Sequence, residues 1–108
     1  MNYAEMKDHE INLGVLKKYI PYEDLVSGPL DDGSIMWGDG ANWHKFNPCN
    51  SWADAGPIIG KENISLIFGF GHWDAMSPDG QSLQAEEVNP LRAAMIVFLM
   101  MQEKKDEQ

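Results

Sequence analysis

The sequence has little cysteine and little positive charge. Cys49 is its one cysteine, so an internal disulfide is excluded, and a lone cysteine is typical of a reducing compartment. The chain of 108 residues has 8 lysines and arginines against 17 aspartates and glutamates, for a net charge of −9. Because phosphate binding needs clustered lysine and arginine, we expect no direct binding of nucleic acid.

Long hydrophobic runs are also missing. The longest, "AAMIVFLMM" at 93–101, is too short to cross a bilayer, which takes about twenty apolar residues. The first twenty residues carry charges throughout and lack the apolar stretch of a secretory signal. We therefore expect a cytoplasmic protein that does not enter a membrane.

The acidity itself has two interpretations. It can serve only solubility, or the acidic surface can imitate DNA and occupy a basic host protein. The acidic residues are scattered, with clusters only at 31–32, at 86–87 and in the C-terminal tail. This scatter favours solubility, although both interpretations stay open.

Two helices are predicted near the ends of the chain. Apolar residues at helical spacing predict a helix over 8–19 that Asp8 caps and Pro21 ends. Asn89 and Pro90 are typical of a helix start, and the residues that follow are apolar on most sides of that helix. Such a helix is either deeply buried or shared with a second subunit, so a homodimer through it is one expected arrangement.

Short strands are predicted between these helices. The runs "SIMW" and "NWHKF" predict a hairpin, and "ISLIFGFGHW" at 64–73 predicts a central, buried strand. Asn50 or Ser51 can cap a short helix through "WADAGPII". We expect the α+β class, with a small antiparallel sheet packed by the N-terminal and C-terminal helices. One domain would cover 1–102, followed by a solvated tail at 103–108.

Cys49 is the obvious candidate nucleophile, with His44 five residues earlier. No local catalytic signature surrounds it, so a small buried cysteine is the favoured interpretation. A zinc site would have to use His44, Cys49 and His72, which lack the closely spaced pairs of structural zinc sites. We expect no catalytic residue, no metal and no other cofactor.

Four tryptophans lie between 37 and 73, in or beside the predicted turns. Tryptophan is enriched at binding hot spots, although each one singly is more often part of a core. Trp43 and His44 could stack on a small planar ligand. The predicted binding residues are Trp37, Trp43, His44, Trp52, Trp73 and Arg92.

Arg92 belongs to this set because of its position. It lies in the first turn of an otherwise apolar helix, where the helix dipole disfavours positive charge. We expect a compensating partner, which is either a carboxylate such as Asp54 or Asp74 or an anionic ligand.

Several segments resemble the NinX family, small proteins encoded by lambdoid-type bacteriophages and prophages. They are "NPCNSWADAGPII", "ENISLI", "NPLRAAMIVFLMMQE" and the opening "MNYAEMKDHEIN". The resemblance implies an accessory protein in the cytoplasm of an infected or lysogenic bacterium. The resemblance supplies this setting and leaves the mechanism open, since it carries over neither an enzymatic activity nor functional residues.

We predict a non-catalytic protein that binds a host or phage protein, in a role such as blunting a bacterial defence. One alternative is a binding protein that sequesters a small molecule or nucleotide. The other is a small enzyme that uses Cys49 or a carboxylate.

Overall fold

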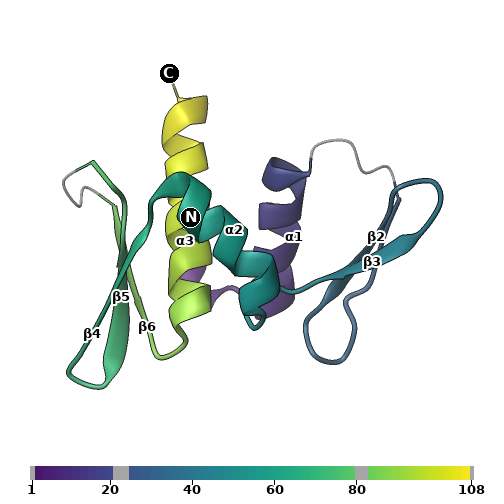
Figure 1. Cartoon of the computed structure of the whole chain (residues 1–108). Helices are drawn as coiled ribbons and strands as arrows, with labels where there is room; N and C mark the ends of the chain where they lie inside the picture. Colours follow the sequence, from purple (N-terminus) through teal and green to yellow (C-terminus); the bar gives the residue numbers. More distant parts are fainter. Residues whose placement is uncertain (1, 21–24, 80–82, 108) are drawn as a thin grey trace.

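The computed structural model describes residues 2–20, 25–79 and 83–107. Figure 1 shows the helices in the middle of the molecule with a small sheet on either side. The α+β class is confirmed, with the terminal helices in contact, but the described residues form two sheets where one was expected. The elements are the 3-10 turn η1 (Tyr3–Glu5), α1 (Asp8–Tyr19), β1 (Leu25–Ser27), β2 (Ile35–Gly38), β3 (Trp43–Phe46), α2 (Trp52–Glu62), β4 (Ser65–Gly69), β5 (His72–Met76), β6 (Gln84–Glu87) and α3 (Pro90–Asp106).

The first sheet has the strand order β1-β2-β3 and is antiparallel throughout. The predicted hairpin is confirmed as β2 and β3, with Trp37 opposite His44. Strand β1 was not predicted, because three residues are too few to show an alternating pattern.

The second sheet has the order β4-β5-β6, also antiparallel. The expected single strand over 64–73 is wrong, because the chain reverses at Phe70 and Gly71, whose φ angles are 54° and 82°. Two successive residues with positive φ form the hairpin turn that suits the twist of paired strands. The first half of the run is consequently an edge strand, and β5 is the central one.

Helix α1 has the predicted bounds, but Asp8 does not cap it. The cap residue is Lys7, whose backbone N–H donates to Glu10 Oε1 at 2.8 Å. Asp8 is the first helical residue, where a negative charge also suits the helix dipole. This leaves its carboxylate free to point at other partners.

The core is built around α3, which packs against α1, α2 and β4–β6. Asn89 caps it as predicted, its side chain accepting from Leu91 N at 2.9 Å. The apolar side chains of 93–99 are buried within one chain. The homodimer through this helix stays a prediction, and the helix continues to Asp106 through the exposed residues 103–106.

Candidate functional site

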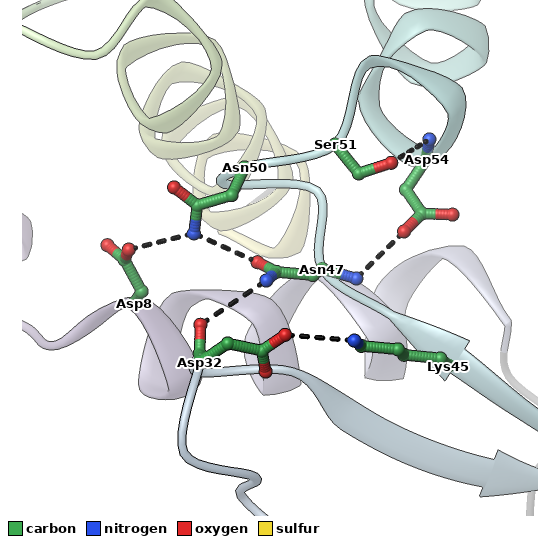
Figure 2. A pocket seen from close by; sticks show the side chains of 7 residues that line it. All are labelled: Asp8, Asp32, Lys45, Asn47, Asn50, Ser51 and Asp54. Carbon is green, nitrogen blue, oxygen red and sulfur yellow. Dashed lines mark hydrogen bonds and ion pairs between the residues drawn. The ribbon is translucent and has the colours of Figure 1, made fainter.

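A polar hollow of about 620 Å³ opens where the loop between β3 and α2 meets the start of α1 (Figure 2). Ser51 caps α2 there by accepting from Asp54 N at 3.4 Å, which confirms one of the two predicted caps. The residues that line the hollow are Asp8, Asp32, Lys45, Asn47, Asn50, Ser51 and Asp54.

Asn47 is the centre of this hollow. Its backbone N–H donates to Asp54 Oδ2 at 2.9 Å, and its side-chain amide donates to Ser34 Oγ at 3.2 Å. Its carbonyl oxygen accepts from Asn12 at 2.8 Å and from Asn50 at 3.1 Å. The buried Asn47 therefore connects Ser34 before β2, Asn12 in α1 and Asn50 in the loop before α2.

Asn12 extends the same network into the core. Its side chain is fully buried, and it donates to Gly33 O at 2.9 Å as well as to Asn47. Its oxygen accepts the backbone N–H of Cys49 at 3.1 Å. A buried amide must find partners because its desolvation is costly, and Asn12 has them on three sides.

The carboxylates of the hollow are committed to partners within the chain. Asp32 accepts from Ser34 N at 2.9 Å and pairs with Lys45 at 2.9 Å. These two neighbours, Ser34 first, hold the pKa of Asp32 well below its usual range, so this carboxyl stays charged. Asp8 accepts from Asn50 at 3.0 Å, and Asp54 accepts from Asn47. This arrangement favours a structural junction over acid–base chemistry.

Arg92 forms ion pairs with two carboxylates near the polar hollow. Its Nε donates to Glu87 Oε1 and its Nη1 to Asp8 Oδ1, both at 2.8 Å. The expected compensation by a carboxylate is confirmed, but the carboxylates named as examples, Asp54 and Asp74, are wrong. Burial opposes the charge, yet the hydrogen bonds to Asp8 and Glu87 raise the pKa of Arg92 above its ordinary value.

The same guanidinium also holds the N-terminal turn. Its Nη2 donates to the backbone oxygens of Tyr3, Ala4 and Met6 at 3.3, 3.2 and 2.6 Å. The planar fork of arginine makes this several-sided bonding feasible. The charge in the first turn of α3 is evident from the sequence, but of its partners only Glu87 is near. Asp8 and the N-terminal turn lie 84 to 89 residues away.

Cys49 and His44 do not form a catalytic pair. His44 Nε2 is hydrogen-bonded to Asp39 Oδ2 at 2.8 Å, and its ring stacks on Trp37 with 4.5 Å between centroids. Cys49 is fully buried. Burial first, and then the charge of Asp8, raises the pKa of its thiol to about 12. The thiolate needed for nucleophilic attack is therefore scarce at neutral pH.

The predicted tryptophans do not gather on one surface. Trp37 and Trp43 lie on the first sheet, Trp52 begins α2, and Trp73 lies on the second sheet, across the helices from the first (Figure 1). Trp43 and Trp52 are more than half exposed, at 55% and 59%. Trp73 is half-buried and packs against Phe68, with ring centroids 5.2 Å apart.

The tip of the β4–β5 hairpin carries exposed apolar side chains that the sequence reasoning missed. Phe70 is fully exposed, and Ile67 and Phe68 are 52% and 59% exposed. We call these three residues the hairpin tip. The signal for them was the "GFG" in the middle of an apolar run, because glycines on both sides of a phenylalanine suit a turn better than a buried strand.

No helix in the described part of the chain is long and apolar enough to cross a membrane. No curated protein matches the sequence. A family model described as "Bacteriophage P22, NinX" matches residues 2–102, and so the chain belongs to the NinX family of bacteriophage P22.

Proposed function

We propose that this phage protein is a non-catalytic accessory protein that binds a host or phage protein through the hairpin tip. The observation that carries the proposal is the conformation of Phe70. Its side chain is fully exposed, and its φ of 54° lies in the left-handed region. For residues other than glycine and asparagine, this left-handed conformation costs about 1–2 kcal/mol.

Folding alone gives no reason for phenylalanine at this position. The exposed ring contributes no burial to the core, and asparagine or glycine would suit the turn better. Strained residues persist where something other than stability requires them. Aromatic side chains next to further exposed apolar residues, here Ile67 and Phe68, are the usual anchors of protein interfaces.

The charge around the hairpin indicates the chemistry of the partner. Residues 62–91 include no lysine or arginine. The acidic residues of that range are Glu62, Asp74, Asp79, Glu86 and Glu87. Three of them pair with cations outside the range, Glu62 with Lys105, Asp79 with Lys104 and Glu87 with Arg92. The negative charge that a partner would meet therefore comes from Asp74 and Glu86. A partner with an apolar pocket and a basic rim would be complementary to this part of the molecule, and its association would slow as salt is added.

The structure offers less support for the two alternatives. The carboxylates of the polar hollow would repel an anionic nucleotide, and His44 already stacks on Trp37. The high pKa of Cys49 does not suit a nucleophile. These observations favour protein binding over sequestration of a small molecule and over catalysis.

The test compares Phe70→Asn with Trp52→Ala. The tagged proteins are recovered from infected cells, the partner is identified, and its affinity is measured with purified components. Phe70→Asn should weaken binding by about thirtyfold or more, as loss of a hot spot does. Trp52→Ala removes an exposed aromatic away from the tip and should change the affinity little. Equal affinity of Phe70→Asn and the unmodified protein would contradict the proposal.

A further inference from the structure

Three metal-ligating side chains meet on the second sheet. His72 and Asp74 are two residues apart on β5, so they point to the same face of the sheet. Glu86 on β6 lies directly opposite Asp74. The neighbouring pair Ala75 and Ala85 lies on the other face, where Ala75 is fully buried and both belong to the core beside α3. The three side chains therefore share the face that points away from α3.

The distances among these groups are unusual for hydrogen bonds. His72 Nε2 lies 3.6 Å from Asp74 Oδ1 and 3.5 Å from Glu86 Oε2. Each of the three residues has a ligand atom within 4.8 Å of the others. Hydrogen bonds between nitrogen and oxygen are commonly about 2.7–3.2 Å. By contrast, His44 and Asp39 are 2.8 Å apart, as a hydrogen-bonded pair should be.

The same distances suit ligands of one ion. A tetrahedral zinc ion with bonds of about 2.0–2.1 Å separates its ligand atoms by roughly 3.3–3.4 Å. The two distances from His72 are already close to this value, and the oxygens of Asp74 and Glu86 lie within 4.8 Å of each other. Each of the three side chains is partly exposed and so has room to adjust its rotamer around an ion.

We propose that His72, Asp74 and Glu86 bind one divalent transition-metal ion of the zinc type. One imidazole nitrogen with two carboxylate oxygens is a donor set that suits zinc, whereas magnesium and calcium prefer oxygen alone. The two carboxylates balance the charge of the ion. A cation also removes the repulsion between Asp74 and Glu86, since like charges directly opposite each other destabilise a sheet.

Three protein ligands leave at least one coordination position for water or for a donor from another molecule. The site lies on the sheet that carries the hairpin tip, yet it uses none of the tip residues. Ile67 of the tip lies opposite Asp74, and Asp74 and Glu86 also supply charge to the proposed interface, so the two proposals share this surface. Their tests stay separate, because Phe70→Asn leaves all three ligands in place and His72→Ala leaves the tip intact.

The experiment is calorimetric titration of ZnCl₂ into the purified protein after removal of any polyhistidine tag. We expect one Zn²⁺ per chain, with no competition from a large excess of Mg²⁺. His72→Ala should weaken binding by at least about tenfold, a conservative figure given that loss of groups that merely support metal ligands costs 10–100-fold. His44→Ala is the matched control, because it removes another partly exposed strand histidine paired with an aspartate.

Histidine NMR locates the ion independently of the variants. Zinc should shift or broaden the ring signals of His72 and leave those of His44 in place. Glu86→Gln should weaken binding while leaving the circular dichroism spectrum unchanged. Absence of binding at millimolar Zn²⁺, or equal affinity of His72→Ala and the unmodified protein, would overturn the inference.

Discussion

Arg92 Nη1 lies 2.8 Å from Asp8 Oδ1 and so joins two helices whose first turns are 84 residues apart in the sequence. Only 12% of the Arg92 side chain is exposed, and its other nitrogens reach Glu87 and the N-terminal turn. A buried charge with this many partners organises its surroundings, because removing it strands two carboxylates and several carbonyls.

Arg92→Ala should lower the free energy of unfolding by about 2 kcal/mol, less than for a fully buried ion pair, because 36% of the Asp8 side chain and 20% of the Glu87 side chain are exposed. The stability of Arg92→Lys should lie between that of Arg92→Ala and that of the unmodified protein, because an ammonium group keeps the charge but cannot reproduce the planar fork of arginine. Urea unfolding followed by tryptophan fluorescence gives both values. Lys18→Ala is the control, since the exposed Lys18–Asp106 pair should contribute no more than about 1 kcal/mol. Equal stability of Arg92→Ala and Lys18→Ala would contradict this account.

Asn12→Ala should destabilise the protein strongly, although it removes only one amide. The substitution leaves Gly33 O, Cys49 N and the Asn47 side chain short of a partner in the interior. Each buried unsatisfied group costs about 1–3 kcal/mol, so a total loss of about 3 kcal/mol is expected. Thermal unfolding measures it, and Asn42→Ala on an exposed loop serves as the comparison. A change as small as that of the loop variant would mean that the amide network contributes little.

Stability should fall at alkaline pH partly because of Cys49. Burial raises the pKa of its thiol from an ordinary 9.0 to about 12, so the thiol ionises more easily in the unfolded chain. The stabilisation from the neutral buried thiol is complete below pH 9 and is lost as the pH rises toward 12. Urea unfolding from pH 8 upward should therefore show a shallower decline for Cys49→Ala than for the unmodified protein.

Tyr3 adds to the alkaline decline in both proteins, because burial raises the pKa of its hydroxyl as well. The comparison between the two slopes removes this contribution. If the two proteins lost stability with pH at the same rate, Cys49 would ionise as easily in the folded chain as in the unfolded chain, which would contradict the prediction. We also expect Cys49 to be alkylated slowly at neutral pH in the folded protein and faster after unfolding in urea, because only the exposed thiolate reacts.

Phe70→Asn should leave the protein at least as stable as before. Asparagine tolerates positive φ better than phenylalanine, so about 1 kcal/mol of backbone strain is relieved. Phe70→Val should lower the stability, because a β-branched residue adopts a positive φ poorly. Thermal unfolding of the two variants checks the order. Destabilisation by Phe70→Asn would mean that the ring supports the hairpin, which would weaken the functional argument.

Local patterns were enough for the elements whose ends are set by their own residues. Helix α1 has the predicted bounds, and Asn89 with Pro90 begins α3 as expected. Asn89 and Pro90 act within one turn, so this helix start is visible in the sequence. The cap of α1 was less clear, since it is Lys7 where Asp8 was expected. The run at 64–73 was misread because apolar residues in a hairpin and in a buried strand look alike until the turn is recognised.

The sequence by itself determined the class of the fold, the start of α3 and the excess of negative charge. The structure added that the apolar side chains of α3 are buried within one chain. The tertiary structure alone decided which charges meet. Arg92 found Asp8 and Glu87, and His72 found Asp74 with Glu86 across two strands. His72 and Asp74 share a face because they are two residues apart on one strand. The contacts of Arg92 with Asp8 and of Asp74 with Glu86 depend instead on helix packing and strand register between separate segments, which no local pattern encodes. The exposure of Phe70 was not predicted either, because it follows from the turn between β4 and β5, which depends on how the two strands pair.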